Sequence, residues 1–477
     1  MAYKFLPEQQ EVIDAPESCI KVRAGAGTGK TTTLTGYAAA RPTKRILYLA
    51  FNKAIQEEAG RRFGRNTTCR TVHSMAYQAI GKQYVEKLDG SVRTIEASKK
   101  LDLTYIEAYQ VINTLTQWLL SDDPVIERKH AKQANVVPFF RDAMVKHAEI
   151  LWDMMVDLDS DIPMTHDGYL KLYQLKGLHQ EDFSRYDIVL MDEAQDTNPV
   201  TNRMLEEFKG TKVYVGDQNQ SIYAFRGAIN AMSKIDAAEY RISSSFRFGP
   251  QVADVANVFL KYTLNDDMRL RGLGADSIIN PQYDSMGQQA IIGRTNTFLI
   301  NKAIDAMESG QRFHVVGGTD SLKLSVLLDA YRLFCDKRDF IFSPYILQFE
   351  DYQSLRDFAK DTEDPESLWL CKTVERFTRR VPDIVKKIKE NNCKKMADAD
   401  LILCTAHKSK GLEFEDATLG DDFKDLYSDE GIDIQEGNLI YVAVTRAKKY
   451  LRMNESLSRF IKHPFINPAL TKKEAVA

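Results

Sequence analysis

Residues 19–34 read CIKVRAGAGTGKTTTL, in which an apolar stretch runs into three closely spaced glycines and then into Lys30 and Thr31. Glycine lets the backbone curl so that its N–H groups point at a phosphate, a lysine reaches terminal phosphates, and a threonine hydroxyl suits Mg²⁺. The order of strand, glycine-rich loop and helix start therefore predicts a phosphate-binding loop. Its strict pattern would have glycine at position 24, where this chain has Ala24.

A second apolar stretch ends in a cluster of carboxylates, because residues 188–198 read IVLMDEAQDTN. Asp192 directly follows the apolar run, where a carboxylate can hold the Mg²⁺ of a bound nucleotide together with the hydroxyl of the loop threonine. Glu193 beside it can act as the general base that activates water. Asp196 and Asn198 stand just before a proline and predict the start of a helix.

Seven apolar stretches of strand length recur along the chain, each followed by polar residues and then by helical spacing. This alternation predicts an α/β fold of parallel sheets covered by helices, with functional loops at the carboxyl ends of the strands. Residues 78–164 and 319–394 are instead rich in helix formers, and we predict that they are helical insertions. The seven stretches are CIKVRAGAG, RILYLAFN, YDIVLMDE, TKVYVGDQ, QAIIGRTN, RFHVVGG and LILCTAHK.

Composition excludes several classes of protein. A chain of 477 residues with a net charge of -3 must meet any polyanion with a local patch rather than with its overall field. The 6 cysteines include no C-x-x-C pair, which argues against a zinc site, an iron–sulfur cluster or a disulfide framework. We find no secretory signal and no apolar stretch that could span a bilayer, and we expect a cytoplasmic protein with no membrane partner.

Six motifs stand in the order and approximate spacing of those of the UvrD/Rep-type superfamily 1 DNA helicases: AGAGTGKT, DEAQD, VGDQNQSIYAFRGA, SSSFRFG, TAHKSKGLEF and LIYVAVTRAKK. More narrowly, HSMAYQAIG, MTHDGYLKL and SFRFG resemble the helicase region of the eukaryotic F-box DNA helicases. The likeness covers nearly the whole chain and is weakest in residues 86–150 and 319–394. Because only 8 residues precede Gln9, we expect no F-box and no F-box-mediated partner.

The resemblance implies two RecA-like P-loop NTPase domains with ATP between them. In the family, hydrolysis opens and closes the cleft and pulls single-stranded DNA through it. We expect the first domain at residues 1–77 and 165–235, and the second at 236–318 and 395–465, each interrupted by one of the two helical insertions. Residues 466–477 are expected to form a tail.

The resemblance also assigns residues that contact ATP. Gln9 matches the glutamine that reads adenine and Phe246 the aromatic residue that stacks on it. Glu413 matches the residue near the ribose, and Gln220 the glutamine that senses the terminal phosphate. The residue after the loop threonine is often basic and covers the other face of adenine; here it is Thr32, so we expect looser base selectivity. In the loop, contacts are expected from Ala24, Gly25, Ala26, Gly27, Thr28, Gly29, Lys30, Thr31 and Thr32.

Two arginines match those that approach the phosphates from the second domain, Arg247 and Arg446. Charge spreads over the phosphoryl oxygens in the transition state, and a planar guanidinium offers several donors to it. A lone arginine more often forms a surface ion pair, which is the competing interpretation. The expected magnesium ligands are Thr31 and Asp192, and the expected catalytic set is Lys30, Asp192, Glu193, Gln220, Arg247 and Arg446.

Aromatic and basic residues in the same motifs are expected to bind DNA. Aromatic rings stack on unpaired bases of any identity, which suits a protein that moves along DNA without reading its sequence. Core packing is the alternative for the rings, and a structural role is the alternative for the histidines. The expected DNA-binding residues are Phe51, Asn52, Lys53, His73, Tyr223, Phe225, Arg226 and His407.

Residues 371–395 hold 9 lysines and arginines against 3 acids. This segment lies in the second insertion, where family members place a domain that meets duplex DNA. A run of like charge is also typical of a solvated helix face, and the sequence leaves both interpretations open.

These observations lead us to expect an ATP- and Mg²⁺-dependent DNA helicase or translocase that acts on single-stranded DNA and duplex junctions and moves 3′-to-5′, as its relatives do. A translocase that displaces proteins with little unwinding is the alternative. A P-loop enzyme that phosphorylates a small molecule would leave SFRFG, KGLEF and VTRAKK without a role. The sequence does not distinguish DNA repair or recombination from plasmid or phage replication or defence.

Overall fold

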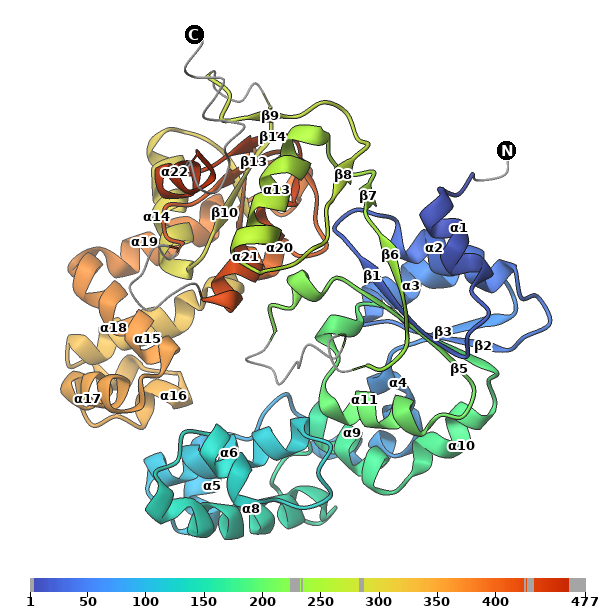
Figure 1. The fold of residues 1–477 in the computed structure, drawn as a ribbon. Coiled ribbons are helices and arrows are strands. Elements are labelled where there is room, and N and C mark those ends of the chain that lie inside the picture. The colour runs from blue at the N-terminus through green and yellow to red at the C-terminus, as the bar shows by residue number, and fades with distance from the viewer. Residues whose placement is uncertain are drawn as a thin grey trace. The chain divides into compact units, whose positions relative to one another are not determined.

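The computed structural model consists of two compact units, Met1–Ser243 and Ser244–Ala477, each built around a parallel sheet flanked by helices (Figure 1). The units are described separately below. The residues that the structure describes are 4–223, 232, 235–282, 287–423, 426 and 433–462.

The sheet of the first unit has six strands in the order β3-β2-β4-β5-β1-β6, and every neighbouring pair is parallel. Parallel strands leave all of their carboxyl ends at one edge, so the polar residues that follow them gather there. The strands are β1 (Cys19–Ala24), β2 (Ile46–Leu49), β3 (Thr67–Arg70), β4 (Ile188–Met191), β5 (Thr211–Gly216) and β6 (Ala238–Ile242).

Helices cover both faces of this sheet, and the alternation of side chains along β2 shows how. Ile46 and Tyr48 pack into a core cluster with α1, α2 and α3, while Leu47 and Leu49 pack into a second cluster with α4, α9 and α11. All four side chains are buried, as expected for a strand in the middle of a parallel sheet. The helices are α1 (Pro7–Asp14), α2 (Lys30–Ala39), α3 (Lys53–Arg62), α4 (Val72–Ala79), α9 (His166–Leu175), α10 (Leu178–Ser184) and α11 (Pro199–Glu207).

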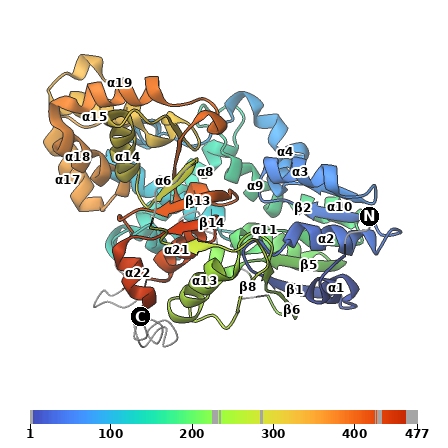
Figure 2. The ribbon, with the colours of Figure 1, turned by 90° about the horizontal axis from the view of Figure 1, so that it is seen from above.

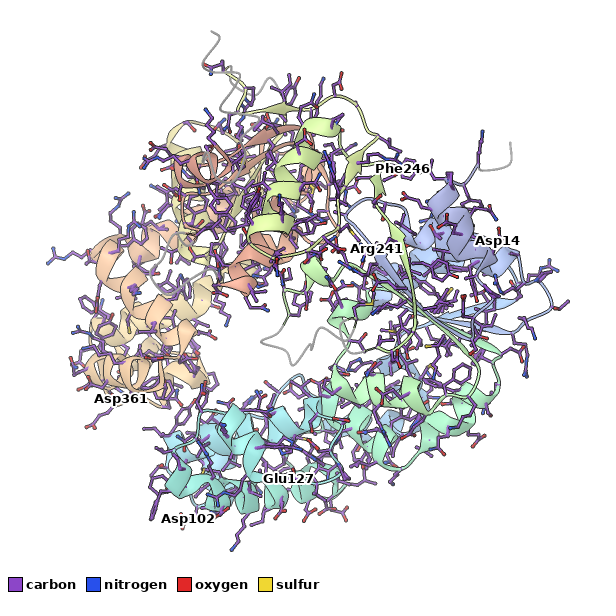
Figure 3. All side chains as sticks on the ribbon, viewed as in Figure 1. Asp14, Asp102, Glu127, Arg241, Phe246 and Asp361 are labelled. Carbon is purple, nitrogen blue, oxygen red and sulfur yellow. The ribbon has the colours of Figure 1, made fainter. Side chains whose placement is uncertain are left out.

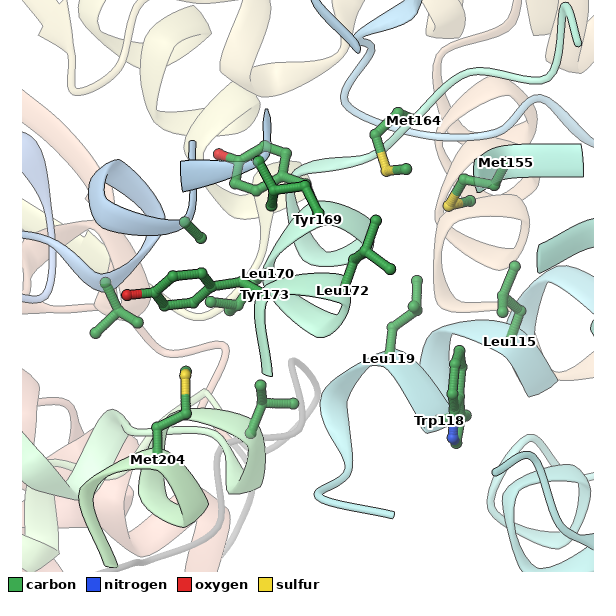
Figure 4. Close-up of a cluster of buried hydrophobic side chains, with 14 of the residues drawn as sticks. Leu115, Trp118, Leu119, Met155, Met164, Tyr169, Leu170, Leu172, Tyr173 and Met204 are labelled. Carbon is green, nitrogen blue, oxygen red and sulfur yellow. The ribbon is translucent and has the colours of Figure 1, made fainter. Parts of the chain in front are cut away.

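Four helices fill the first insertion: α5 (Thr94–Leu101), α6 (Tyr105–Leu120), α7 (Arg128–Gln133) and α8 (Arg141–Val156). The Trp118 ring of α6 meets the Trp152 ring of α8 edge to face at 5.0 Å. One apolar cluster continues from Leu119 through Leu172 of α9 to Met204 of α11 (Figure 4). The insertion therefore shares a hydrophobic core with the helices that cover the first sheet.

The second unit repeats the architecture with the strand order β11-β12-β10-β13-β14-β9, again all parallel. In Figure 2, α13 and α21 lie together beside the sheet; α21 contacts β13 and β14, α13 contacts β14, and α14 contacts β12. The strands are β9 (Ile278–Ile279), β10 (Gln289–Gly293), β11 (Phe313–Val315), β12 (Leu401–Thr405), β13 (Phe414–Leu419) and β14 (Ala447–Arg452), with a separate parallel pair, β7 (Ser244–Ser245) and β8 (Arg271–Gly272).

The helices that pack around this sheet are α13 (Pro250–Tyr262), α14 (Asn296–Glu308), α20 (Ala406–Ser409), α21 (Ile434–Val444) and α22 (Glu455–Lys462). The second insertion is helical as well and consists of α15 (Leu324–Phe334), α16 (Pro344–Leu347), α17 (Tyr352–Thr362), α18 (Pro365–Phe377) and α19 (Val381–Asn391). Among the described residues, no helix combines the length and the apolarity needed to cross a membrane.

The α/β class is confirmed, and each of the seven apolar stretches contains a strand of one of the two sheets. Two expectations need correction. Strand β6 pairs with β1, so the first sheet runs to Ile242 and the first unit to Ser243, beyond the expected boundary at residue 235. The N-cap of α11 is Asn198 alone, whose side chain accepts from the Thr201 N–H; Asp196 is buried and lies before the helix.

Lys171 of α9 joins the first insertion to the helices of the sheet. Its ammonium is fully buried, donates to the carbonyls of Ser121 at 2.8 Å and Asp123 at 2.6 Å, and lies 4.8 Å from the centre of the Trp118 ring. Burial lowers the pKa of Lys171 from 10.5 to about 8, against the opposing charges of Asp123 and Asp122.

This pKa predicts how stability depends on pH. Between pH 8 and pH 10.5 the unfolded chain binds the Lys171 proton more tightly than the folded chain does, so the contribution of Lys171 to the free energy of unfolding rises with pH across this window, by at most about 3 kcal/mol. Urea denaturation should show this rise in the unsubstituted protein and in the control Lys176→Met, which changes an exposed lysine, but not in Lys171→Met. Parallel pH profiles for all three proteins would contradict the assignment.

Candidate nucleotide-binding site

The glycine-rich loop between β1 and α2 has the backbone that a phosphate cradle needs. Gly27 and Gly29 adopt the left-handed conformation, with φ of 73° and 79°, which side chains other than glycine rarely tolerate. Gly29 is the N-cap of α2, so the first N–H groups of this helix face the loop. The Thr28 hydroxyl donates to the Gly25 carbonyl at 2.9 Å and stabilises the curl from within. An anion at this loop would meet both free N–H groups and the positive end of the helix dipole.

Lys30, the first residue of α2, lies beside the carboxylate cluster. Its Nζ is 3.1 Å from Glu193 Oε1, and both side chains are largely buried. Burial alone would lower the pKa of Lys30, but the carboxylates of Glu193, Asp217 and Asp192 outweigh it and raise the pKa. Lys30 is therefore a firmly charged ammonium at the end of the loop.

Asp192 follows β4 and is held from three sides. Tyr48 Oη donates to Oδ2 at 2.6 Å, Thr31 Oγ1 donates to the same oxygen at 3.2 Å, and the Glu193 N–H donates to Oδ1 at 2.9 Å. Burial, followed by the charge of Glu193, raises the pKa of Asp192. The result is a carboxylate of fixed orientation next to the hydroxyl of α2.

The donor set at Thr31 and Asp192 fits Mg²⁺, because a hydroxyl and a carboxylate are the hard oxygen ligands that this ion takes. Within the described residues, no group of three or more His, Cys, Asp and Glu side chains could hold a metal ion. Mg²⁺ usually takes one or two protein ligands and completes its shell with phosphate oxygens and water.

Glu193 is held in an uncommon backbone conformation, with φ of 51°. Its carboxylate is fixed at both ends: Oε1 faces the Lys30 ammonium, and Oε2 accepts from Gln195 Nε2 at 2.5 Å. Left-handed backbone is uncommon at residues other than glycine, and strained backbone often clusters at functional sites. The strained residue is thus the one that the sequence assigns as the base.

Gln195 connects this carboxylate to the turn after β5. Besides Glu193, its side chain binds the Asp217 N–H, which donates to Oε1 at 3.0 Å, and Asp217 Oδ2 in turn accepts from Gln220 Nε2 at 2.7 Å. Ser221 Oγ donates to the Gln195 carbonyl at 3.3 Å. A Cβ at Gly216 would lie 2.3 Å from Gln195 Oε1, so only glycine leaves room for this link.

The remaining expected ATP contacts of the first unit lie at the loop. Gln9 is fully buried, donates through Nε2 to the Thr28 carbonyl at 3.3 Å and accepts the Leu6 N–H at 3.0 Å. The side chain is therefore anchored against the loop. Thr32 is half-buried in the first turn of α2.

Three expected residues of the second unit come together at the start of β13 and β14. Arg247 donates from Nε to Glu413 Oε1 at 2.8 Å and from Nη1 to the Thr445 carbonyl at 3.0 Å. Arg446 is buried and donates to the carbonyls of Val442 at 2.9 Å and Leu412 at 3.3 Å. Arg446 thus has a structural role within its own unit in addition to any role toward a phosphate.

Phe246 directly follows β7, and its ring is 44% exposed, which leaves a face for stacking (Figure 3). Glu413 also lines a cavity of about 450 Å³ in the second unit. The other charged residues that line this cavity form two ion pairs across β13 and β14, Lys448 with Glu415 at 2.7 Å and Arg452 with Asp416 at 3.0 Å.

The expected DNA-binding residues have mixed surroundings. The rings of Phe51 and Tyr223 are stacked at 5.7 Å with an interplanar angle of 13°, and Phe51 is 37% exposed, which is unlike core packing. Asn52 is the N-cap of α3 and accepts the Ile55 N–H at 2.9 Å, so its side chain has a structural task. Lys53 is exposed.

The two histidines lie in different units. His73 Nε2 is 3.3 Å from Asp167 Oδ1 and is partly exposed, and His407 lies half-buried in α20 of the second unit. Phe225 and Arg226 are outside the described residues.

Sequence reasoning missed four residues of the first unit that touch the expected site: Tyr48, Gln195, Asp217 and Arg62. Tyr48 reads as an ordinary strand residue, and no sequence signal marks it. Gln195 and Asp217 belong to the DEAQD and GDQNQ motifs and could have been found there. The contact between them, from the Asp217 N–H to Gln195 Oε1, depends on the neighbouring positions of β4 and β5, which local sequence does not reveal.

Comparison with known proteins agrees with this site. The family model described as AAA domain matches residues 9–226, and the one described as UvrD-like helicase C-terminal domain matches residues 347–458. F-box DNA helicase 1 of Gallus gallus is 31% identical over 96% of this chain and 50% of the relative. F-box DNA helicase protein 1 of Schizosaccharomyces pombe is 30% identical over 95% and 57%. ATP-dependent DNA helicase UvrD2 of Mycobacterium tuberculosis is 26% identical over 52% and 42%.

The chain spans about half the length of the first two of these relatives. The two family matches fall on different units: the first covers the glycine-rich loop and the carboxylates after β4, and the second covers Glu413 and Arg446. Together with the order of the six motifs, these matches show that the chain belongs to the UvrD-like superfamily 1 helicases.

Proposed function

We propose that this chain is an ATP-dependent DNA helicase or translocase that moves along single-stranded DNA, in the 3′-to-5′ direction. The observation that carries the proposal is the contact between the phosphate loop and the carboxylates after β4. Lys30 Nζ lies 3.1 Å from Glu193 Oε1, and Thr31 Oγ1 lies 3.2 Å from Asp192 Oδ2. These are the parts needed to bind a nucleoside triphosphate and to activate water beside it.

In this proposal the loop N–H groups and the Lys30 ammonium bind the phosphates. Thr31 and Asp192 would hold Mg²⁺, which, when bound, neutralises charge on the phosphate oxygens. Tyr48 fixes the orientation of Asp192, and its hydrogen bond keeps one carboxylate oxygen directed at the Thr31 hydroxyl.

Glu193 acts as the general base, which typically contributes about 10²–10⁴-fold to a rate. A phosphate bound by the loop shares the Lys30 ammonium with Glu193, and Gln195 holds the other carboxylate oxygen. The carboxylate is therefore oriented before water is deprotonated. Arg247 and Arg446 of the second unit are proposed to stabilise the charge that develops on the transferred phosphoryl group.

The Phe51 and Tyr223 rings are proposed to stack on unpaired bases, each worth about 1–3 kcal/mol. Tyr223 stands three residues after Gln220, and the Ser221 hydroxyl between them binds the Gln195 carbonyl. One short segment thus joins the proposed base-stacking residue to the side chain that orients Glu193. This connection supports ATP turnover that responds to DNA.

A second form of this function is displacement of bound proteins with little unwinding. Unwinding and displacement would use the same ATPase. The segment 371–395 bears on the difference, because its excess of six positive charges lies on the described α18 and α19 and the turns beside them. We propose that it contacts the phosphates of duplex DNA, an interaction that weakens steeply with salt.

The proposal predicts ATP turnover that depends on single strands. We expect turnover to rise at least about tenfold with single-stranded DNA, to rise far less with blunt duplex DNA, and to be lost in Lys30→Ala, because stacking requires unpaired bases and the phosphates require the ammonium. Phosphate release is measured without DNA, with single-stranded DNA and with blunt duplex DNA. Unwinding of a 3′-tailed but not a 5′-tailed duplex should accompany it. Turnover that ignores DNA while a small molecule becomes phosphorylated would contradict the proposal.

The Gln195 link predicts a separable defect. Gln195→Met keeps the length of the side chain but removes the amide that holds Glu193, so the maximal turnover with single-stranded DNA should fall about 10²-fold while ATP affinity stays within about twofold. Steady-state turnover and equilibrium ATP binding measure the two quantities. Gln133→Met, at an exposed residue of α7, is the control. Normal DNA-stimulated turnover in Gln195→Met would show that the link does not serve the reaction.

A further inference from the structure

A second cation stands at the phosphate loop besides Lys30. Arg62, the last residue of α3, donates from Nη2 to Thr32 Oγ1 in the first turn of α2 at 2.6 Å. The two residues are 30 positions apart in the sequence, and the loop between β2 and α3 and the helix itself bring them together. Position 32 is where the resemblance to the helicase family leads us to expect a basic residue, and this chain has Thr32.

The place of this contact on α2 suggests which part of a nucleotide it serves. Successive residues of an α-helix are about 100° apart, so Thr32 points about 200° away from Lys30 around the helix axis. Lys30 faces Glu193, where the terminal phosphate would lie. A nucleotide with its terminal phosphate on that side must extend its sugar and base away from it, and the guanidinium of Arg62 is on the opposite side of the helix.

The chemistry of Arg62 is suited to a base. A guanidinium is planar, always charged and weakly hydrated, and it stacks on aromatic faces. In the described part of the chain, its one other polar contact is an ion pair from Nη1 to Glu58 Oε1 at 3.4 Å. Such a pair between neighbouring turns is weak. The Thr32 hydroxyl therefore fixes one edge of the guanidinium. The Arg62 side chain is 38% exposed, so a face of the guanidinium stays accessible.

Helix capping explains only part of this arrangement. An arginine in the last turn of a helix interacts favourably with the helix dipole, and Arg61 has the same advantage. The dipole does not require a hydrogen bond to a different helix. Within the described residues, Arg62 reaches the first turn of α2 by a side-chain hydrogen bond to Thr32, and this bond holds its guanidinium beside that turn.

We propose that Arg62 is a base-binding residue, whose guanidinium stacks on the base of the bound nucleotide in place of a basic residue at position 32. This inference rests on the proposed function. In this proposal the cation that position 32 lacks comes from α3, and the Thr32 hydroxyl positions it.

The test compares ligands with and without a base. Equilibrium affinities for ATP and for inorganic tripolyphosphate are measured with the full chain and with Arg62→Ala. ATP affinity should fall about tenfold, as expected for the loss of one cation–π contact, while tripolyphosphate affinity stays unchanged. The KM for ATP should rise by the same factor with an unchanged kcat. Arg61→Ala, which removes the neighbouring exposed arginine, should bind both ligands normally.

A relocation variant provides the positive control. Thr32→Arg in the Arg62→Ala background returns a guanidinium to the same place from α2, so ATP affinity should recover. Equal loss of affinity for ATP and tripolyphosphate would show that Arg62 binds phosphate and would overturn the inference, as would unchanged ATP affinity in Arg62→Ala. Absence of DNA-stimulated turnover in the unsubstituted chain would instead refute the proposed function, and the binding measurements would still decide the role of Arg62.

Discussion

The first unit depends on how it keeps two adjacent carboxylates, Asp192 and Glu193, at the buried end of one strand. Two like charges in such a place repel each other and are poorly solvated. The Lys30 ammonium lies 3.1 Å from Glu193, and Tyr48 and Thr31 donate to Asp192. Removing one partner of a buried charge pair typically costs about 3–5 kcal/mol. Two of these partners, Lys30 and Thr31, are also residues that the phosphate loop would present to a ligand.

The same constraint links the loop to the rest of the sheet. Since β4 lies between β2 and β5, Asp192 can receive the Tyr48 hydroxyl from one neighbour, and Gln195 can reach Asp217 after the other. Gly216 is required where that glutamine passes the strand end. A change in the contacts of the turn after β5, which carries Gln220 and Tyr223, is thereby felt at Glu193 through direct hydrogen bonds. In the proposed function, this chain of hydrogen bonds would couple nucleotide chemistry to DNA.

Sequence patterns predicted the parts of this arrangement that are encoded locally. The apolar stretches predicted their strands because β-branched and leucine runs suit buried parallel strands. The loop glycines predicted the left-handed backbone at Gly27 and Gly29. Strand β6 was missed because AEYRI has only one fully buried residue, and its place beside β1 is set by a long-range pairing. Tyr48 and Arg62 were missed because their contacts cross 144 and 30 residues of sequence.

The account is tested most directly by measuring ATP binding and ATP hydrolysis in Glu193→Gln with single-stranded DNA present. Glutamine keeps the size of the side chain and can still accept a hydrogen bond, but it cannot take a proton from water. The account predicts that ATP still binds, with affinity within a few-fold of the unsubstituted protein, while hydrolysis falls by about 10²–10⁴-fold. Hydrolysis at the normal rate would contradict it, because the carboxylate that Lys30 and Gln195 hold in place would then have no part in the reaction.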